Sequence, residues 1–186
     1  MARNVVHGIV KKVIDSSARL VDIDIVNDYS LSFLYADIHA FDKGRGKDKN
    51  YSAINNISDK GVYVFFDDEE VLYVGKSGSG NNGTLQHRIK QHIVDNVQTS
   101  PIMKYYYYEC KNSYYSQYGS TLWEGTKFES VRRQFKDDYF YNFLCNYSLL
   151  IISAIKKSQS PQKDYDYVIS RLESALIALL NPSANA

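Results

Sequence analysis

The chain has 186 residues, of which 44% are hydrophobic, and a formal net charge of +1. This length suits one domain with a sizeable core, and the apolar content argues against intrinsic disorder. No stretch approaches the roughly 18 to 20 continuous apolar residues of a membrane span, and the first residues lack the features of a signal peptide. We therefore expect a cytoplasmic protein that has no membrane partner.

Charge and cysteine content narrow the choice of partners only in part. A near-neutral chain is unusual for a strong phosphate binder, although local basic patches bind phosphate and catalytic carboxylates lower the total charge. Cys110 and Cys145 form no CxxC motif, so neither a zinc site nor a redox site is predicted. The 17 tyrosines suit cores, interfaces and base-stacking surfaces alike.

The first 60 residues contain two candidate strands, at residues 5–14 and 19–26. The segment at residues 30–41 is ambiguous between strand and helix. A glycine-containing stretch follows, with basic residues at alternate positions: Lys43, Arg45, Lys47 and Lys49. This stretch is either a solvated connector or a basic arm that contacts a phosphate backbone.

A β-hairpin is predicted from two strands rich in Val, Tyr and Phe, at residues 61–66 and 71–75. The two strands are joined by a tight acidic turn at residues 67–70. A third strand is predicted at residues 103–110, where four successive tyrosines would place rings on both faces.

A flexible loop at residues 77–83 leads into a predicted helix, for which Thr84 is a suitable N-cap. The apolar stripe of this helix consists of Leu85, Ile89 and Ile93. Arg88 and His92 are four positions apart and flank the stripe on one side. Because a guanidinium matches phosphate geometry, this pair favours an anionic ligand.

The C-terminal half contains a polar, aromatic loop and then a segment at residues 128–157 that looks helical. A turn follows, and the last helix, which Pro182 ends, is predicted at residues 164–181. Its inward-facing residues are expected to be Val168, Ile169, Leu172, Leu176, Leu179 and Leu180.

Glu173 is out of place for packing alone, because it interrupts an apolar row between Ile169 and Ile177. A carboxylate buried without a partner costs several kcal/mol. Glu173 therefore either borders solvent or meets a cation. That cation is a Lys or Arg from another element, or it is a metal ion.

These motifs together resemble the GIY-YIG endonuclease family. The two tripeptides that name the family appear as Gly-Val-Tyr at residues 61–63 and Tyr-Val-Gly at residues 73–75, with nine residues between Tyr63 and Tyr73. Each tripeptide has Val in place of Ile, which is a conservative departure.

Two further motifs follow in the family's order. Arg88 and His92 resemble its Arg-x-x-x-His helix. The closing motif, a Glu followed nine and twelve positions later by Pro and Asn, is similar to Glu173, Pro182 and Asn185. Four motifs in the right order make chance a poor explanation.

The resemblance covers residues 61–110 and 165–185. It implies an α+β fold with a small three-stranded antiparallel sheet flanked by helices. Residues 1–60 would then be an N-terminal extension containing the basic connector, and residues 61–186 the nuclease domain. Within that domain, residues 111–164 would form a helical insertion, as in the type II restriction endonucleases of the family.

The resemblance implies a metal-dependent phosphodiesterase. In such an enzyme Tyr63 takes a proton from the attacking water, and Glu173 holds one divalent cation, Mg²⁺ or Mn²⁺, against the scissile phosphate. A free tyrosine has a pKa of about 10, so its use as a base near neutral pH needs help. Arg88, Lys76 and the metal are expected to lower that pKa. Arg88 would also neutralise charge on the phosphoryl oxygens, and Lys76 is a further candidate phosphate contact.

The resemblance also places Tyr73 and His92 at the water or the phosphate, and Asn185 as a residue that orients its neighbours by hydrogen bonding. Tyr63 and Tyr73 reach one site only if their rings lie on the same face of the hairpin. A regular four-residue loop at residues 67–70 would put them on opposite faces. We therefore predict a β-bulge or an odd-numbered connection, with Tyr63 opposite Tyr73.

The implied substrate is double-stranded DNA, cut by a sequence-specific, restriction-type enzyme. A homodimer would supply one metal site for each strand. Arg132 and Arg133 in the insertion are candidate DNA contacts, as are the four basic residues at 43–49. The alternatives are a nicking or structure-specific nuclease of the family, a non-catalytic nucleic-acid-binding module of the same fold, or a protein-binding surface formed by the Tyr-rich residues 103–147.

Overall fold

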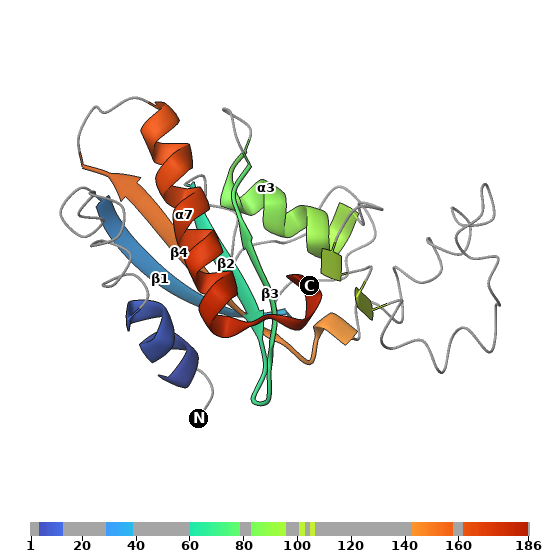
Figure 1. Ribbon diagram of the computed structural model, residues 1–186. Helices are drawn as coiled ribbons and strands as arrows, with labels where there is room; N and C mark the ends of the chain where they lie inside the picture. The colour runs from blue at the N-terminus through green and yellow to red at the C-terminus, as the bar shows by residue number, and fades with distance from the viewer. Residues whose placement is uncertain are drawn as a thin grey trace.

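The protein has an α+β fold in which a four-stranded antiparallel sheet carries helices on both faces (Figure 1). The computed structural model describes residues 4–12, 29–38, 60–78, 83–95, 101–102, 105–106, 143–157 and 162–185. No helix within these ranges is long and apolar enough to cross a membrane.

The sheet contains strands β1 (Tyr29–Asp37), β2 (Lys60–Phe66), β3 (Val71–Lys76) and β4 (Ser148–Lys156), in the spatial order β1-β4-β2-β3. All neighbouring strands are antiparallel. The prediction of three strands is therefore wrong. Of the four strands, β2 and β3 were predicted, β1 comes from the predicted N-terminal extension and β4 from the predicted insertion, and the predicted strand at residues 103–110 is not among them.

The prediction of a helix at residues 128–157 is wrong for the residues of β4. This strand lies between β1 and β2, and most of its residues are buried. Because a strand buried on both faces is a continuous apolar run, its sequence lacks the alternation that marks a half-buried strand. Periodicity alone does not separate such a strand from a buried helix.

The opposite error occurs in two shorter segments, which were predicted to be strands but are helical where they are described. Residues 4–12 form a helix, although residues 5–14 were predicted to be extended. Tyr105 and Tyr106 are helical within the predicted strand at 103–110. The second candidate strand, at residues 19–26, lies outside the described residues.

Helix α7 (Gln162–Leu180) and the helix at residues 4–12 pack on one face of the sheet. Four of the predicted inward residues of α7 are buried: Val168, Ile169, Leu172 and Leu176. Leu179 is exposed, contrary to prediction, and it lies in the last turn of the helix. Leu180, in the same turn, is partly buried and packs against the core on this face of the sheet.

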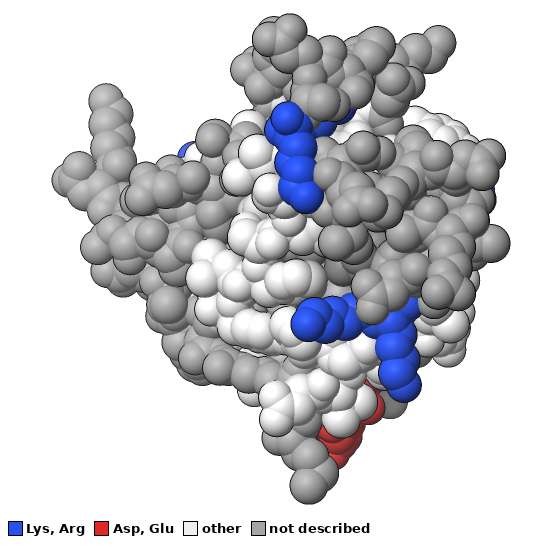
Figure 2. Space-filling model, turned by 90° about the vertical axis from the view of Figure 1, so that its left-hand side faces the viewer, with Lys and Arg blue, Asp and Glu red and all other residues white. Residues whose placement is uncertain are grey.

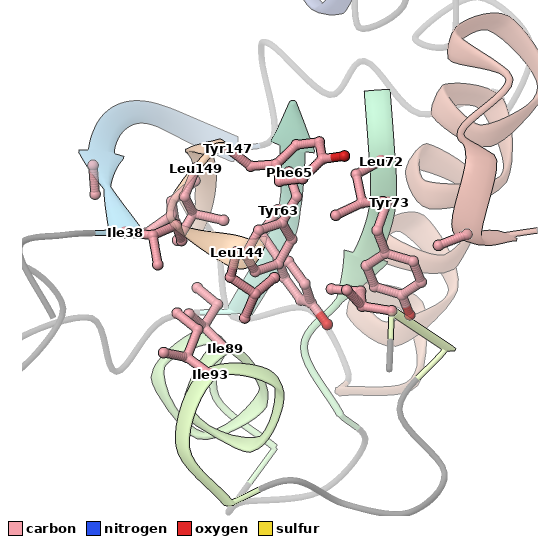
Figure 3. Packing of buried hydrophobic residues seen from close by; sticks show 14 of the residues in the cluster. Ile38, Tyr63, Phe65, Leu72, Tyr73, Ile89, Ile93, Leu144, Tyr147 and Leu149 are labelled. Carbon is pink, nitrogen blue, oxygen red and sulfur yellow. The ribbon is translucent and has the colours of Figure 1, made fainter. Parts of the chain in front are cut away.

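Helix α3 (Leu85–Lys90) packs on the opposite face and continues into the π-helical turn η2 (Gln91–Asp95). The predicted stripe of this helix, Leu85, Ile89 and Ile93, is buried against the side chains of β2 and β3 (Figure 3). The sheet is therefore covered on both sides next to the hairpin.

The β2–β3 hairpin turns at Asp67, whose carboxylate Oδ1 accepts hydrogen bonds from the backbone N–H groups of Glu69 and Glu70. The pairing register shifts next to this turn, which is the predicted β-bulge. Tyr63 and Tyr73 consequently lie on the same face, as predicted. Their pairing differs from the prediction, because Tyr63 is opposite Gly75 while Phe65 is opposite Tyr73.

The glycines of the two tripeptides are required for space. A Cβ atom on Gly61 would overlap the backbone carbonyl oxygen of Ile152 in β4. A Cβ atom on Gly75 would lie 2.5 Å from the Cζ and hydroxyl oxygen of Tyr63, and 2.7 Å from the ring of Tyr73. Gly61 thus lets the backbone of β4 approach β2 closely, and Gly75 lets the two tyrosine rings lie against β3.

We expect Gly61→Ala to lower the free energy of unfolding by about 1–3 kcal/mol, because the backbone of Ile152 blocks the added methyl group. Gly8→Ala is the matched control, since Gly8 lies in a helix and its Cβ position is open. This control should raise stability by up to about 1 kcal/mol through helix propensity. Urea unfolding measures both, and equal effects would contradict the packing explanation.

Candidate active site

The candidate site is centred on a buried hydrogen bond between Tyr63 in β2 and His92 in η2. The Tyr63 hydroxyl oxygen lies 2.7 Å from Nε2 of His92. Tyr63 is 0% exposed and His92 is 3% exposed. The bond joins the sheet to the helix that covers it, at a position from which water is excluded.

Helix α3 brings His92 to this position through its N-terminal cap and its apolar stripe. Thr84 is the N-cap, as predicted, and its side chain accepts a hydrogen bond from the backbone N–H of His87 at 3.2 Å. His92 then falls in the π-helical turn that follows. Single π-helical turns occur frequently at functional sites, where they change the direction of a side chain.

Tyr73 completes a cluster of three rings. Its ring centroid is 6.1 Å from that of Tyr63 and 5.2 Å from that of His92. Figure 3 shows both tyrosines projecting from neighbouring strands on the same side of the sheet. The β-bulge therefore brings together the two tyrosines that the sequence predicts for one site.

Burial is the main influence on Tyr63, and it raises the pKa of the hydroxyl well above its ordinary value. Tyr73 raises this pKa further, and Arg88 lowers it without reversing the shift. Arg88 thus acts in the expected direction, but the net shift of the Tyr63 pKa is upward. The reason is that desolvation of a buried phenolate outweighs one guanidinium.

His92 is neutral in this environment. Burial, followed by the positive charge of Arg88, lowers its pKa from 6.5 to about 3. A neutral imidazole has one donor and one acceptor nitrogen, so it forms a neutral pair with the Tyr63 hydroxyl. The pair holds one proton between two groups that are both protected from solvent.

Arg88 provides an incompletely bonded donor beside this pair. Its Nη1 donates to Oε1 of Gln91 at 2.8 Å. Within the described part of the chain, the buried Nε–H of Arg88 has no hydrogen-bond acceptor. A buried donor without an acceptor is costly, so the position suits an oxygen of an anionic ligand. Sequence reasoning missed Gln91, although its spacing of three from Arg88 is the helical signal for such a contact.

Glu173 meets a cation, which is one of the two outcomes expected from its position on the apolar row. Its Oε2 lies 2.9 Å from Nζ of Lys76 in β3. Lys76 also donates to the hydroxyl of Ser170, one turn earlier on α7, at 3.0 Å. After burial, the charge of Glu173 is the second cause that raises the pKa of Tyr73, so the carboxylate acts on the same site.

A divalent cation held by the Glu173 carboxylate would need to take most of its other ligands from water or substrate. No cluster of three or more His, Cys, Asp or Glu occurs among the described residues, so they form no complete protein cage. Mg²⁺ often binds through one or two carboxylates plus water and substrate phosphate. The ammonium of Lys76 already occupies the carboxylate, which shows that it accepts a cation.

Asn185 bonds to the backbone of the second tripeptide. Its Oδ1 accepts from the N–H of Val74 and its Nδ2 donates to the carbonyl of Val74, both at 2.8 Å. Since β3 is an edge strand, the side-chain amide takes the place of a neighbouring strand. Asn185 therefore positions the segment between Tyr73 and Gly75, in line with its expected orienting role.

A second carboxylate, missed by sequence reasoning, anchors the segment that carries Asn185. Glu70 accepts hydrogen bonds from the hydroxyls of Ser183 in η5 (Ser183–Asn185) and Tyr147 before β4. Helix α7 ends just before this segment, at Asn181, which has a left-handed backbone with φ of 46°. Glu70 and Asn181 together direct the chain end onto the edge of β3.

The remaining candidate DNA contacts lie outside the described residues: Lys43, Arg45, Lys47, Lys49, Arg132 and Arg133. On the side seen at the left of Figure 1, the described Lys and Arg side chains form separate groups with uncharged residues between them (Figure 2). These described residues therefore make no continuous basic patch on that side.

Comparisons of the chain with models of protein families, with characterised proteins and with solved structures found no match.

The low pKa of His92 predicts a specific loss of stability in acid. Below pH 6.5 the unfolded chain takes up a proton at this residue, whereas the folded protein does so only near pH 3. The free energy of unfolding should therefore fall by up to about 1.4 kcal/mol per pH unit as the pH drops below 6.5. Urea unfolding between pH 5 and pH 7 measures this slope.

His92→Gln should flatten the slope, because glutamine keeps hydrogen-bonding groups and does not titrate. His87→Gln is the matched control, since His87 is exposed on the same helix. If His92→Gln and wild type show equal slopes, His92 is not held neutral by burial.

Proposed function

We propose that the protein is a metal-dependent endonuclease that hydrolyses phosphodiester bonds in double-stranded DNA, in the manner of a restriction enzyme. The observation that carries the proposal is the buried Tyr63–His92 pair beside the unsatisfied Nε–H of Arg88. Glu173 adds a carboxylate that acts on the same site. The order of the four sequence motifs supports the same chemistry.

The phosphate would bind through Arg88. Its buried Nε–H needs an oxygen acceptor, and a guanidinium forms strong, directed hydrogen bonds to phosphate. Negative charge at this position would also offset the charge of Arg88, which is the second cause of the low pKa of His92. Substrate binding would thereby make His92 a better proton acceptor.

Once bound DNA admits water to the Tyr63 hydroxyl, which is buried in the free protein, the proton of the attacking water would pass through Tyr63 to His92. Water oxygen forms the new bond to phosphorus, and the bond to the leaving sugar oxygen breaks. The water proton moves to the Tyr63 oxygen as the proton of Tyr63 moves to Nε2 of His92, and the leaving oxygen takes a proton from solvent. This relay avoids a free phenolate, which the raised pKa of Tyr63 disfavours.

Glu173 would hold the divalent cation, and Tyr73 borders the same position. When bound, the cation supplies Lewis-acid stabilisation of charge on the phosphoryl oxygens. Asn185 acts from a distance by fixing the backbone beside Tyr73.

Supercoiled plasmid incubated with the protein, with and without Mg²⁺, tests the proposal. Discrete linear fragments are expected with Mg²⁺ and no products with EDTA. Nicked circles alone would favour a nicking enzyme, and a gel shift without cleavage would favour a binding module.

Tyr63→Phe removes one hydroxyl and should lower the cleavage rate by at least about 100-fold, as loss of acid–base catalysis does. Tyr167→Phe is the control, because Tyr167 is exposed on α7. A Tyr63→Phe protein that cleaves at the wild-type rate would remove Tyr63 from the reaction.

Glu173→Gln should abolish Mg²⁺-dependent cleavage and leave DNA affinity within a few-fold of wild type. Asp166→Asn is the control, since Asp166 also lies on α7 and pairs with a lysine of the sheet, Lys60, but is seven residues from Glu173. Normal cleavage by Glu173→Gln would show that the cation binds elsewhere.

A further inference from the structure

Two lysines of the sheet pair with two carboxylates of α7. Nζ of Lys60 in β2 lies 2.8 Å from Oδ1 of Asp166, and Nζ of Lys76 in β3 lies 2.9 Å from Oε2 of Glu173. Asp166 and Glu173 are seven residues apart, so they lie on the same side of the helix, two turns from each other. The two ion pairs thus join the same helix to neighbouring strands.

The two ion pairs differ in which partner is more exposed to solvent. In the first pair the lysine is buried, with 10% of its side chain exposed, and Asp166 is 35% exposed. In the second pair Lys76 is 38% exposed and Glu173 is 18% exposed. The Lys76 side chain is already partly in water, so it can leave the ion pair easily. Glu173 would then be left as a largely buried carboxylate in need of a cation.

The Lys76 ammonium has a second partner on α7, the hydroxyl of Ser170. The Lys76 ammonium donates to the Ser170 hydroxyl at 3.0 Å, and that hydroxyl donates to the carbonyl of Asp166 at 2.7 Å. The hydroxyl oxygen is thus oriented as an acceptor for the lysine. Ser170 therefore helps to hold the ammonium next to Glu173.

We infer that Lys76 is the resident cation of Glu173, and that a divalent cation binds by displacing it. This inference rests on the proposed function, in which Glu173 holds the metal. The lysine neutralises the carboxylate beside Tyr73 until the metal arrives, and the metal must compete with an ammonium for the same oxygen. Lys60 and Asp166 form a structural pair without such an exchange.

A structural role for Lys76 is the weaker explanation. A partly exposed ion pair contributes about 0–1 kcal/mol to stability, and the ammonium of Lys76 is the more exposed partner. Its contact is also redundant for holding the helix, because Lys60 and Asp166 already join α7 to the sheet.

Isothermal titration calorimetry with Mn²⁺ tests the exchange without reference to catalysis. Lys76→Met should bind Mn²⁺ about five- to tenfold more tightly than wild type, because it removes both the competing ion pair and a repelling charge. Lys60→Met is the matched control and should leave the affinity unchanged. Glu173→Gln should bind no Mn²⁺ at this site.

Ser170→Ala provides a second variant that leaves Lys76 in place. It removes one of the two contacts that hold the ammonium, so Mn²⁺ should bind about twofold more tightly. Thermal unfolding of each variant establishes that it is folded.

The outcomes separate the two proposals. Equal Mn²⁺ affinity of wild type and Lys76→Met would overturn the exchange and leave Glu173 as the metal site. Absence of Mn²⁺ binding to both proteins would overturn the metal site of the proposed function and the exchange together.

Discussion

The structure depends on the burial of one hydroxyl group. The hydroxyl of Tyr63 is shielded from water, so a polar partner must lie beside it, and His92 is that partner. This requirement fixes where α3 and η2 pack on the sheet. It also explains Gly75, since any side chain there would collide with the Tyr63 ring. The chemistry of the site follows from the same burial, because it keeps both groups neutral.

The edge of β3 is the second place where fold and site depend on each other. Asn185 bonds to both backbone groups of Val74, and Glu70 holds the adjoining Ser183. These contacts close the exposed side of the strand and keep Tyr73 in place. The C-terminal segment thus acts on the site through the backbone, without a side chain that touches the reacting atoms.

Much of the site was predictable from the sequence. The hairpin, the Thr84 cap and the stripe of Leu85, Ile89 and Ile93 depend on local signals such as turn residues and helical spacing, and all three are confirmed. The shared face of the two tyrosines followed from the family resemblance, which places both at one site, whereas a regular four-residue loop would have put them on opposite faces. The position of Glu173 on an apolar row indicated that its carboxylate either reaches solvent or meets a cation, although the row did not reveal that Lys76 is the partner.

The remaining features required tertiary information. Strand β4 is buried on both faces, so its sequence carries no periodicity that separates a strand from a helix. The helix at residues 4–12 buries Val6 and Val10 against the sheet, a contact that no local signal specifies. The raised pKa of Tyr63 arises from burial by distant segments, whereas the sequence showed only the nearby cations.

The most direct test of the site is a crystal structure of the Tyr63→Phe protein with a short DNA duplex and Mn²⁺, with the cation located by its anomalous scattering. We expect one Mn²⁺ beside Glu173, Lys76 turned away from it, and a phosphate oxygen within about 3 Å of Nε of Arg88. A cation bound away from Glu173, or a phosphate bound away from Arg88, would contradict the assignment of these residues to a phosphodiesterase site.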